Sequence, residues 1–124
     1  MTILNLGQVW VCGAVNSTPP LMCIIGRFDQ FSEVEDGSRI VSVCVTPHPE
    51  AKKAGWPTIS HMPVFEEAFR MSELRFAKEG VALGPDFEDG YSQWRSAFQD
   101  GKAGAYSIKI SEAYAGIVSG KGEK

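Results

Sequence analysis

The sequence predicts an α+β domain in which a strongly curved, mostly antiparallel sheet or partial small barrel of four to five strands carries two amphipathic helices. Three observations lead to this class. The first 46 residues hold three runs rich in β-branched, aromatic and other apolar residues, separated by turn-forming segments. Two later segments space their large apolar residues as helices do. The links between the first strands are short, which favours antiparallel pairing.

The first three strands are expected over residues 8–15, 21–29 and 39–46. Gly26, inside the second strand, predicts a bulge or a bend. The second and third strands are apolar at nearly every position, so both of their faces must be covered. Helices on both sides, closure into a small barrel with a helix outside, or a second subunit would each provide that cover.

The order of these strands, with a Pro-containing turn and then an acidic hairpin between them, resembles the opening of small SH3-like barrels. The pattern "GQVWV…PPLMCII…RIVSVCV" is similar to the entry half of PemK-type toxin barrels and covers roughly the first third of the chain. No catalytic motif of that family can be placed residue by residue on this sequence. The resemblance therefore concerns the strand pattern alone and implies no activity.

Helices are expected at about 63–79 and 89–100, followed by a half-buried strand over 105–111 and a last helical turn that Ser111 caps. Pro63 suits a first helical turn, and Gly90 either begins the second helix or lets another backbone approach. The residues expected to pack on the sheet are Phe65, Phe69, Phe76, Tyr91, Trp94 and Phe98.

Length and composition favour one soluble domain over residues 1–124, with a frayed tail at about 119–124. A formal net charge of -3 argues against sequence-independent binding of nucleic acid. The chain shows no signal-peptide pattern and no apolar run near the roughly 20 residues that cross a bilayer. An odd number of cysteines, three, inside apolar strands indicates buried free thiols and a cytoplasmic location.

The stretch "TPHPEAKKAGWPTISHMP", residues 46–63, holds both histidines. It is interpreted as a proline-stiffened connector in preference to an active-site loop. The candidates for acid–base catalysis are His48 and His61 with Glu50, and the candidates for binding are Trp56 and Tyr91. Two imidazoles without tight spacing do not make a metal site, so we expect no metal and no cofactor.

Two functions from different classes follow. The preferred hypothesis is a non-catalytic interaction module or homo-oligomer, because the strands are apolar on both faces and no convincing catalytic set is found. The alternative is a small hydrolase or ribonuclease-like enzyme that uses His48 or His61 with a nearby carboxylate. The position of the 46–63 loop relative to the largest pocket would separate the two.

Overall fold

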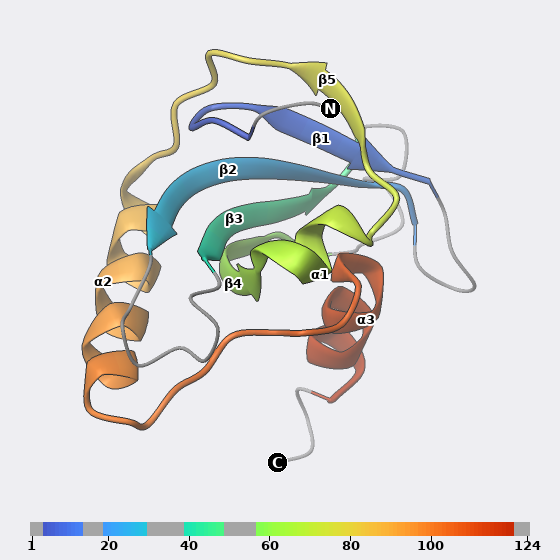
Figure 1. Cartoon of the computed structure of the whole chain (residues 1–124). Coiled ribbons are helices and arrows are strands. Elements are labelled where there is room, and N and C mark those ends of the chain that lie inside the picture. The colour runs from blue at the N-terminus through green and yellow to red at the C-terminus, as the bar shows by residue number, and fades with distance from the viewer. Residues whose placement is uncertain (1–3, 14–18, 30–38, 49–56, 121–124) are drawn as a thin grey trace.

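The computed structural model describes residues 4–13, 19–29, 39–48 and 57–120 (Figure 1). The elements, in chain order, are β1 (Val9–Cys12), β2 (Leu21–Asp29), β3 (Ile40–Pro47), β4 (Ile59–Phe65), α1 (Glu66–Arg70), β5 (Arg75–Lys78), α2 (Pro85–Gln99) and α3 (Ile110–Gly120).

The five strands form one sheet in the order β4-β3-β2-β1-β5, and every neighbouring pair of strands is antiparallel. The sheet is strongly curved, as the long bend of β2 in Figure 1 shows, and it does not close into a barrel. The predicted fold class, a curved antiparallel sheet with helices packed on it, is confirmed. The bulge predicted at Gly26 is also confirmed, because the β2–β3 register shifts between Ile25 and Arg27.

One face of the sheet carries the main hydrophobic core, which α1 and α3 cover. Facing residues of an antiparallel pair point to the same side, so the register places Cys23, Val43 and Met62 together on this face. Phe69 of α1 and Tyr114 of α3 close the core and are almost completely buried. Hydrophobic burial of this size is the main source of stability for a chain of this length.

α2 packs on part of the opposite face, at the end of the sheet where β2 finishes, away from α1 and α3 (Figure 1). His61 alternates with Met62 along β4 and therefore faces α2, where its ring meets the rings of Phe87 and Trp94. No residue of β3 from Ile40 to Val45 is more than 9% exposed. The prediction that both faces are covered is confirmed for the third strand, β3. It is not confirmed for the second strand, because β2 alternates buried and partly exposed residues and Arg27 is exposed.

The predicted helix over 63–79 is wrong. Residues 59–65 are β4, α1 is only five residues long, and residues 75–78 are β5. The helical spacing of the phenylalanines did not decide the structure. Residues 59–65 instead pair with β3, from Ile40↔Phe65 to Val45↔Ile59. The helix ends at Arg70, and Glu73 then takes a left-handed backbone conformation, with φ of 57°, which a continuing helix does not allow.

The predicted strand over 105–111 is also wrong. In the structure this segment forms a single parallel bridge, between Val64 and Tyr106. The amide of Tyr106 donates to Pro63 O, and the amide of Phe65 donates to Tyr106 O, each at 2.9 Å. α3 begins at Ile110, and the side-chain oxygen of Ser72 accepts a hydrogen bond from the Ile110 amide.

Two helix boundaries differ from the prediction in smaller ways. The second predicted helix is present as α2, but it begins at Pro85 because a proline fits the first helical turn. Gly90 lies inside it, not at its start, and a Cβ there would come within 2.9 Å of the Cβ of His61. The last helical turn is longer than expected and forms α3. Residues 121–124 of the predicted tail lie outside the described residues.

Candidate functional site

His61 and Tyr91, both predicted site residues, lie together in a cluster of rings between β4 and α2. The His61 imidazole is surrounded by Phe87, Tyr91 and Trp94, with ring centroids 5.6, 5.8 and 5.5 Å away. Its Nε2 lies 2.9 Å from Oγ of Ser42 on the neighbouring strand β3. The arrangement has the two members of a serine–histidine pair within hydrogen-bond reach.

A second set of polar groups lies beside this cluster. The Tyr91 hydroxyl donates to the Asp29 carboxylate, with both oxygens at 2.9 Å. The Arg95 guanidinium lies 3.5 Å from the same carboxylate. Arg27 pairs with Glu88 at 2.9 Å and lies over the Tyr91 ring, 5.2 Å from its centroid. These contacts tie α2 to the end of β2.

The electrostatics of the cluster favour neutral side chains. Burial lowers the pKa of His61 to about 4, and the negative charge of Asp29 opposes this only in part. Burial and the hydrogen bond to Asp29 raise the pKa of Tyr91 to about 12. A neutral His61 can accept the Ser42 proton, but Ser42 is fully buried and a substrate cannot reach its hydroxyl. The pair fits a packed, hydrogen-bonded interior better than a nucleophile.

The other predicted site residues are not brought to this cluster. His48 follows β3, and its backbone amide donates to Pro20 O. Glu50 and Trp56 lie outside the described residues. The three described candidates, His48, His61 and Tyr91, do not line the pocket described next.

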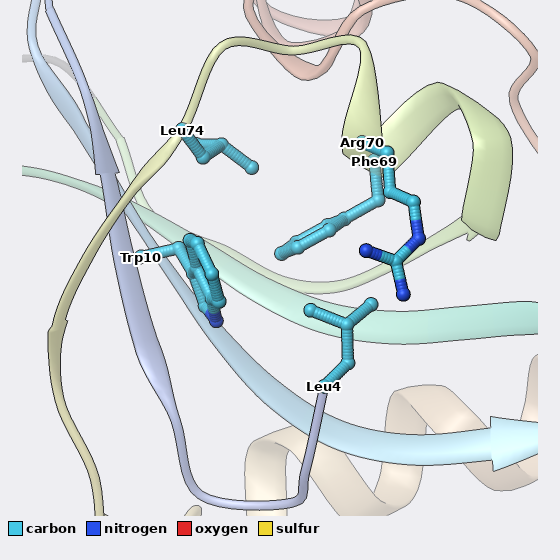
Figure 2. A pocket seen from close by; sticks show the side chains of 5 residues that line it. All are labelled: Leu4, Trp10, Phe69, Arg70 and Leu74. Carbon is cyan, nitrogen blue, oxygen red and sulfur yellow. The ribbon is translucent and has the colours of Figure 1, made fainter. Parts of the chain in front are cut away.

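A pocket of about 200 Å³ opens on the core side of the sheet (Figure 2). Its lining residues are Leu4, Trp10, Phe69, Arg70 and Leu74. Figure 2 shows the Trp10 indole forming one wall and the Phe69 ring pointing in from α1, with the Arg70 guanidinium beside Leu4 at the other side. The walls are apolar, and Arg70 supplies the charge.

The Arg70 guanidinium belongs to a small ionic network. Its Nη2 and Nε lie 2.7 and 3.1 Å from one oxygen of Glu66, and Arg39 donates to the other oxygen at 2.9 Å. The hydrogen bond from Arg39 is the main reason that the pKa of Glu66 lies below its ordinary value. Two cations share one carboxylate, so these three side chains carry a net positive charge.

Strand β5 forms an open edge of the sheet beside the pocket. It pairs with β1 and with no other described strand, and all four of its residues are exposed. Phe76 is 46% exposed, although its ring makes an edge contact with Trp10 at 5.6 Å. Arg75 precedes Phe76 directly, and Lys78 follows it two residues later. The opposite edge of the sheet, β4, is bridged by Tyr106.

Sequence reasoning missed the pocket and this edge. The alternation of apolar and charged residues in "LRF", residues 74–76, is a short signal that could have indicated β5, but it lay inside a segment assigned to a helix. The pocket had no comparable signal, because Leu4, Trp10 and Leu74 come from three segments that only the fold brings together.

The remaining observations concern ligands and relatives. Among the described residues, no three His, Cys, Asp or Glu side chains gather closely enough to hold a metal ion. No helix in that part of the chain is long and apolar enough to span a bilayer. Comparison with protein-family models, with curated proteins and with solved structures finds no match for the chain. The resemblance of the first strands to toxin barrels gains no support from these comparisons.

Proposed function

We propose that this chain is a non-catalytic interaction module that binds an extended, acidic segment of a partner protein along β5. The single observation that carries the proposal is the open β5 edge, where every side chain is exposed. An exposed strand offers unpaired backbone N–H and C=O groups to an added strand, and these supply affinity. Phe76 offers an apolar contact on the side of Trp10.

The charges on β5 favour an acidic partner over a second copy of the chain. Full antiparallel pairing of two β5 strands would place Arg75 of each opposite Lys78 of the other, and parallel pairing in register would oppose identical cations. Like charges directly opposite each other destabilise a strand pair, whereas opposite charges stabilise it. A segment with Glu or Asp at alternate positions meets this edge without repulsion.

The catalytic alternative has weaker support. His61 is packed among three rings, and its hydrogen-bond partner Ser42 is fully buried. Neither His48 nor His61 lines the pocket. A serine–histidine pair can act on a substrate only if the serine hydroxyl is accessible, and Ser42 is fully buried although the His61 ring is partly exposed.

The test is a titration of the ¹⁵N-labelled protein with a short peptide of alternating Glu and Val, followed by backbone amide shifts. We expect saturable shifts at residues 75–78 and weaker binding at high salt, because the charges involved are exposed. Lys78→Glu should weaken binding about two- to five-fold. Lys102→Glu changes the net charge equally on an exposed loop residue away from β5 and should leave binding unchanged.

Two further measurements make the test decisive. The double variant Arg75→Glu with Lys78→Glu should prefer a peptide of alternating Lys and Val, which reverses the selectivity. Light scattering should find the unliganded protein monomeric. Absence of shifts on β5, or equal binding of both peptides by the unmodified chain, would refute the proposal.

A further inference from the structure

The pocket beside Trp10 has the size and polarity of a site for a small apolar body. Leu4, Trp10, Phe69 and Leu74 provide its walls, and the volume is about 200 Å³. An apolar cavity of ~150 Å³ accommodates benzene, so this pocket accommodates an apolar body of about eight carbon atoms by the same measure. Pockets of this kind take most of their affinity from apolar burial and their selectivity from a few polar groups.

The polar groups that could recognise a ligand lie at one side only. The Trp10 indole N–H already donates to Oε1 of Gln8 at 3.1 Å, so it is not offered to the pocket. The side chains of Leu4, Phe69 and Leu74 are hydrocarbon and give no hydrogen bonds to a sugar or another ligand with many hydroxyl groups. Among the described residues, Arg70 is the one charged side chain that lines the pocket.

Arg70 can hold an anion and keep its ion pair with Glu66. A guanidinium has five N–H donors, and Glu66 engages Nε and Nη2. Nη1 has no partner among the described residues and can pair with a carboxylate, for which guanidinium geometry is well suited. The network of Arg39, Glu66 and Arg70 carries one net positive charge, which matches a monoanion and not a phosphate dianion.

We propose that the pocket binds a small amphiphilic monocarboxylate, with its apolar body against Trp10 and Phe69 and its carboxylate on Arg70. This site takes a different ligand from the β5 edge, although Trp10 contacts both, and it does not depend on the proposed function. Binding requires no covalent or redox step.

The experiment follows the Trp10 indole N–H signal of the ¹⁵N-labelled full chain, assigned with Trp10→Phe, during titration with 3-phenylpropanoate. The matched probes are 3-phenylpropan-1-ol and 3-phenylpropan-1-amine, which keep the apolar body and change the charge. We expect saturable shifts with the acid, weaker binding of the alcohol and no binding of the amine. Octanoate, which has a similar carbon count, should compete with the acid.

The matched variants are Arg70→Gln and Arg39→Gln. Each removes one cation from Glu66, but only Arg70 lines the pocket. Arg70→Gln should weaken binding of the acid about ten-fold, and Arg39→Gln should change it by less than about two-fold. Leu74→Trp should fill the pocket and abolish binding of both acid and alcohol, with thermal unfolding used to confirm that the variant is folded.

Three results would overturn the proposal. They are the absence of a saturable Trp10 shift at low millimolar acid, equal affinity for acid and alcohol, and equal loss of affinity in the two arginine variants. Shifts of residues 75–78 with the acidic peptide are read separately, so failure at one site leaves the other interpretable.

Discussion

Replacement of Gly26 by alanine tests how closely α2 packs on the sheet. A Cβ at Gly26 would lie 2.3 and 2.5 Å from Cζ and Cε2 of Phe87, and 2.8 Å from Cδ1 of Leu83. Phe87 is 2% exposed and has little room to move. Overpacking of this kind costs about 1–3 kcal/mol of unfolding free energy. For a chain of this length, each kcal/mol should lower the Tm by about 3–5 °C.

The assay is urea and thermal unfolding of wild type, Gly26→Ala, Phe87→Leu and the double variant. Leucine lacks the two ring atoms nearest to the new methyl group, so Gly26→Ala should lose most of its effect in the Phe87→Leu background, with a coupling energy of about 1–3 kcal/mol. Gly116→Ala is the matched control. It lies in α3 with open space around its Cβ position and should stabilise the protein by about 0.5–1 kcal/mol.

A Gly26→Ala protein that unfolds at the wild-type temperature would refute the close packing of Phe87 on the bulge. The same conclusion would follow if Gly26→Ala cost as much in the Phe87→Leu background as in wild type, because the loss would then come from the backbone of β2 and not from α2.

Three further outcomes are expected. The pKa of His61 is depressed to about 4 from 6.5, so the unfolded chain takes up the proton first and stability falls as pH drops from about 6.5 to 4. Because solvent screens this partly exposed ring, the expected loss of unfolding free energy is about 1–2 kcal/mol. His61→Asn should remove most of the difference in Tm between pH 7 and pH 4.5 in thermal melts. Glu66→Gln should cost about 1 kcal/mol, less at high salt, because both of its arginine partners lose their carboxylate; an unchanged Tm at low salt would contradict this. Burial raises the pKa of the Cys23 thiol, so its reaction with an aromatic disulfide reagent should follow global unfolding, and rapid labelling of the native protein would show that β2 is accessible.

The parts of the fold that sequence analysis predicted well are those in which local pattern and tertiary environment agree. The segment 21–29 is β2 as predicted, because its apolar run, its flanking turn residues and its buried position all favour a strand. The aromatic face of α2 was predicted for the same reason, with Phe87 and Trp94 buried against the sheet. Gly26 was informative since a glycine within a strand usually marks an irregular position.

The errors come from pairing between segments distant in sequence. Phe65, Phe69 and Phe76 fall at helical spacing, yet the first ends a strand, the second lies in a short helix and the third lies in another strand. Partners on β3 and β1 decide the structure of that segment, and a single-sequence pattern does not contain them. The same limitation explains the sites. His61 and Tyr91 were identified as polar rings in suitable elements, whereas the pocket at Trp10 exists only after Leu4 and Leu74 have been brought beside it.

The short bridge at Tyr106 has a consequence for self-assembly. Growth of a sheet from molecule to molecule requires two edge strands with unpaired backbone groups on each copy, so that one edge pairs with the preceding copy and the other with the next. Tyr106 forms hydrogen bonds with the backbone of Pro63 and Phe65 at the outer edge of β4. A second copy whose β5 approaches β4 therefore meets backbone groups that are already hydrogen-bonded, so addition of strands from molecule to molecule through these two edges is disfavoured.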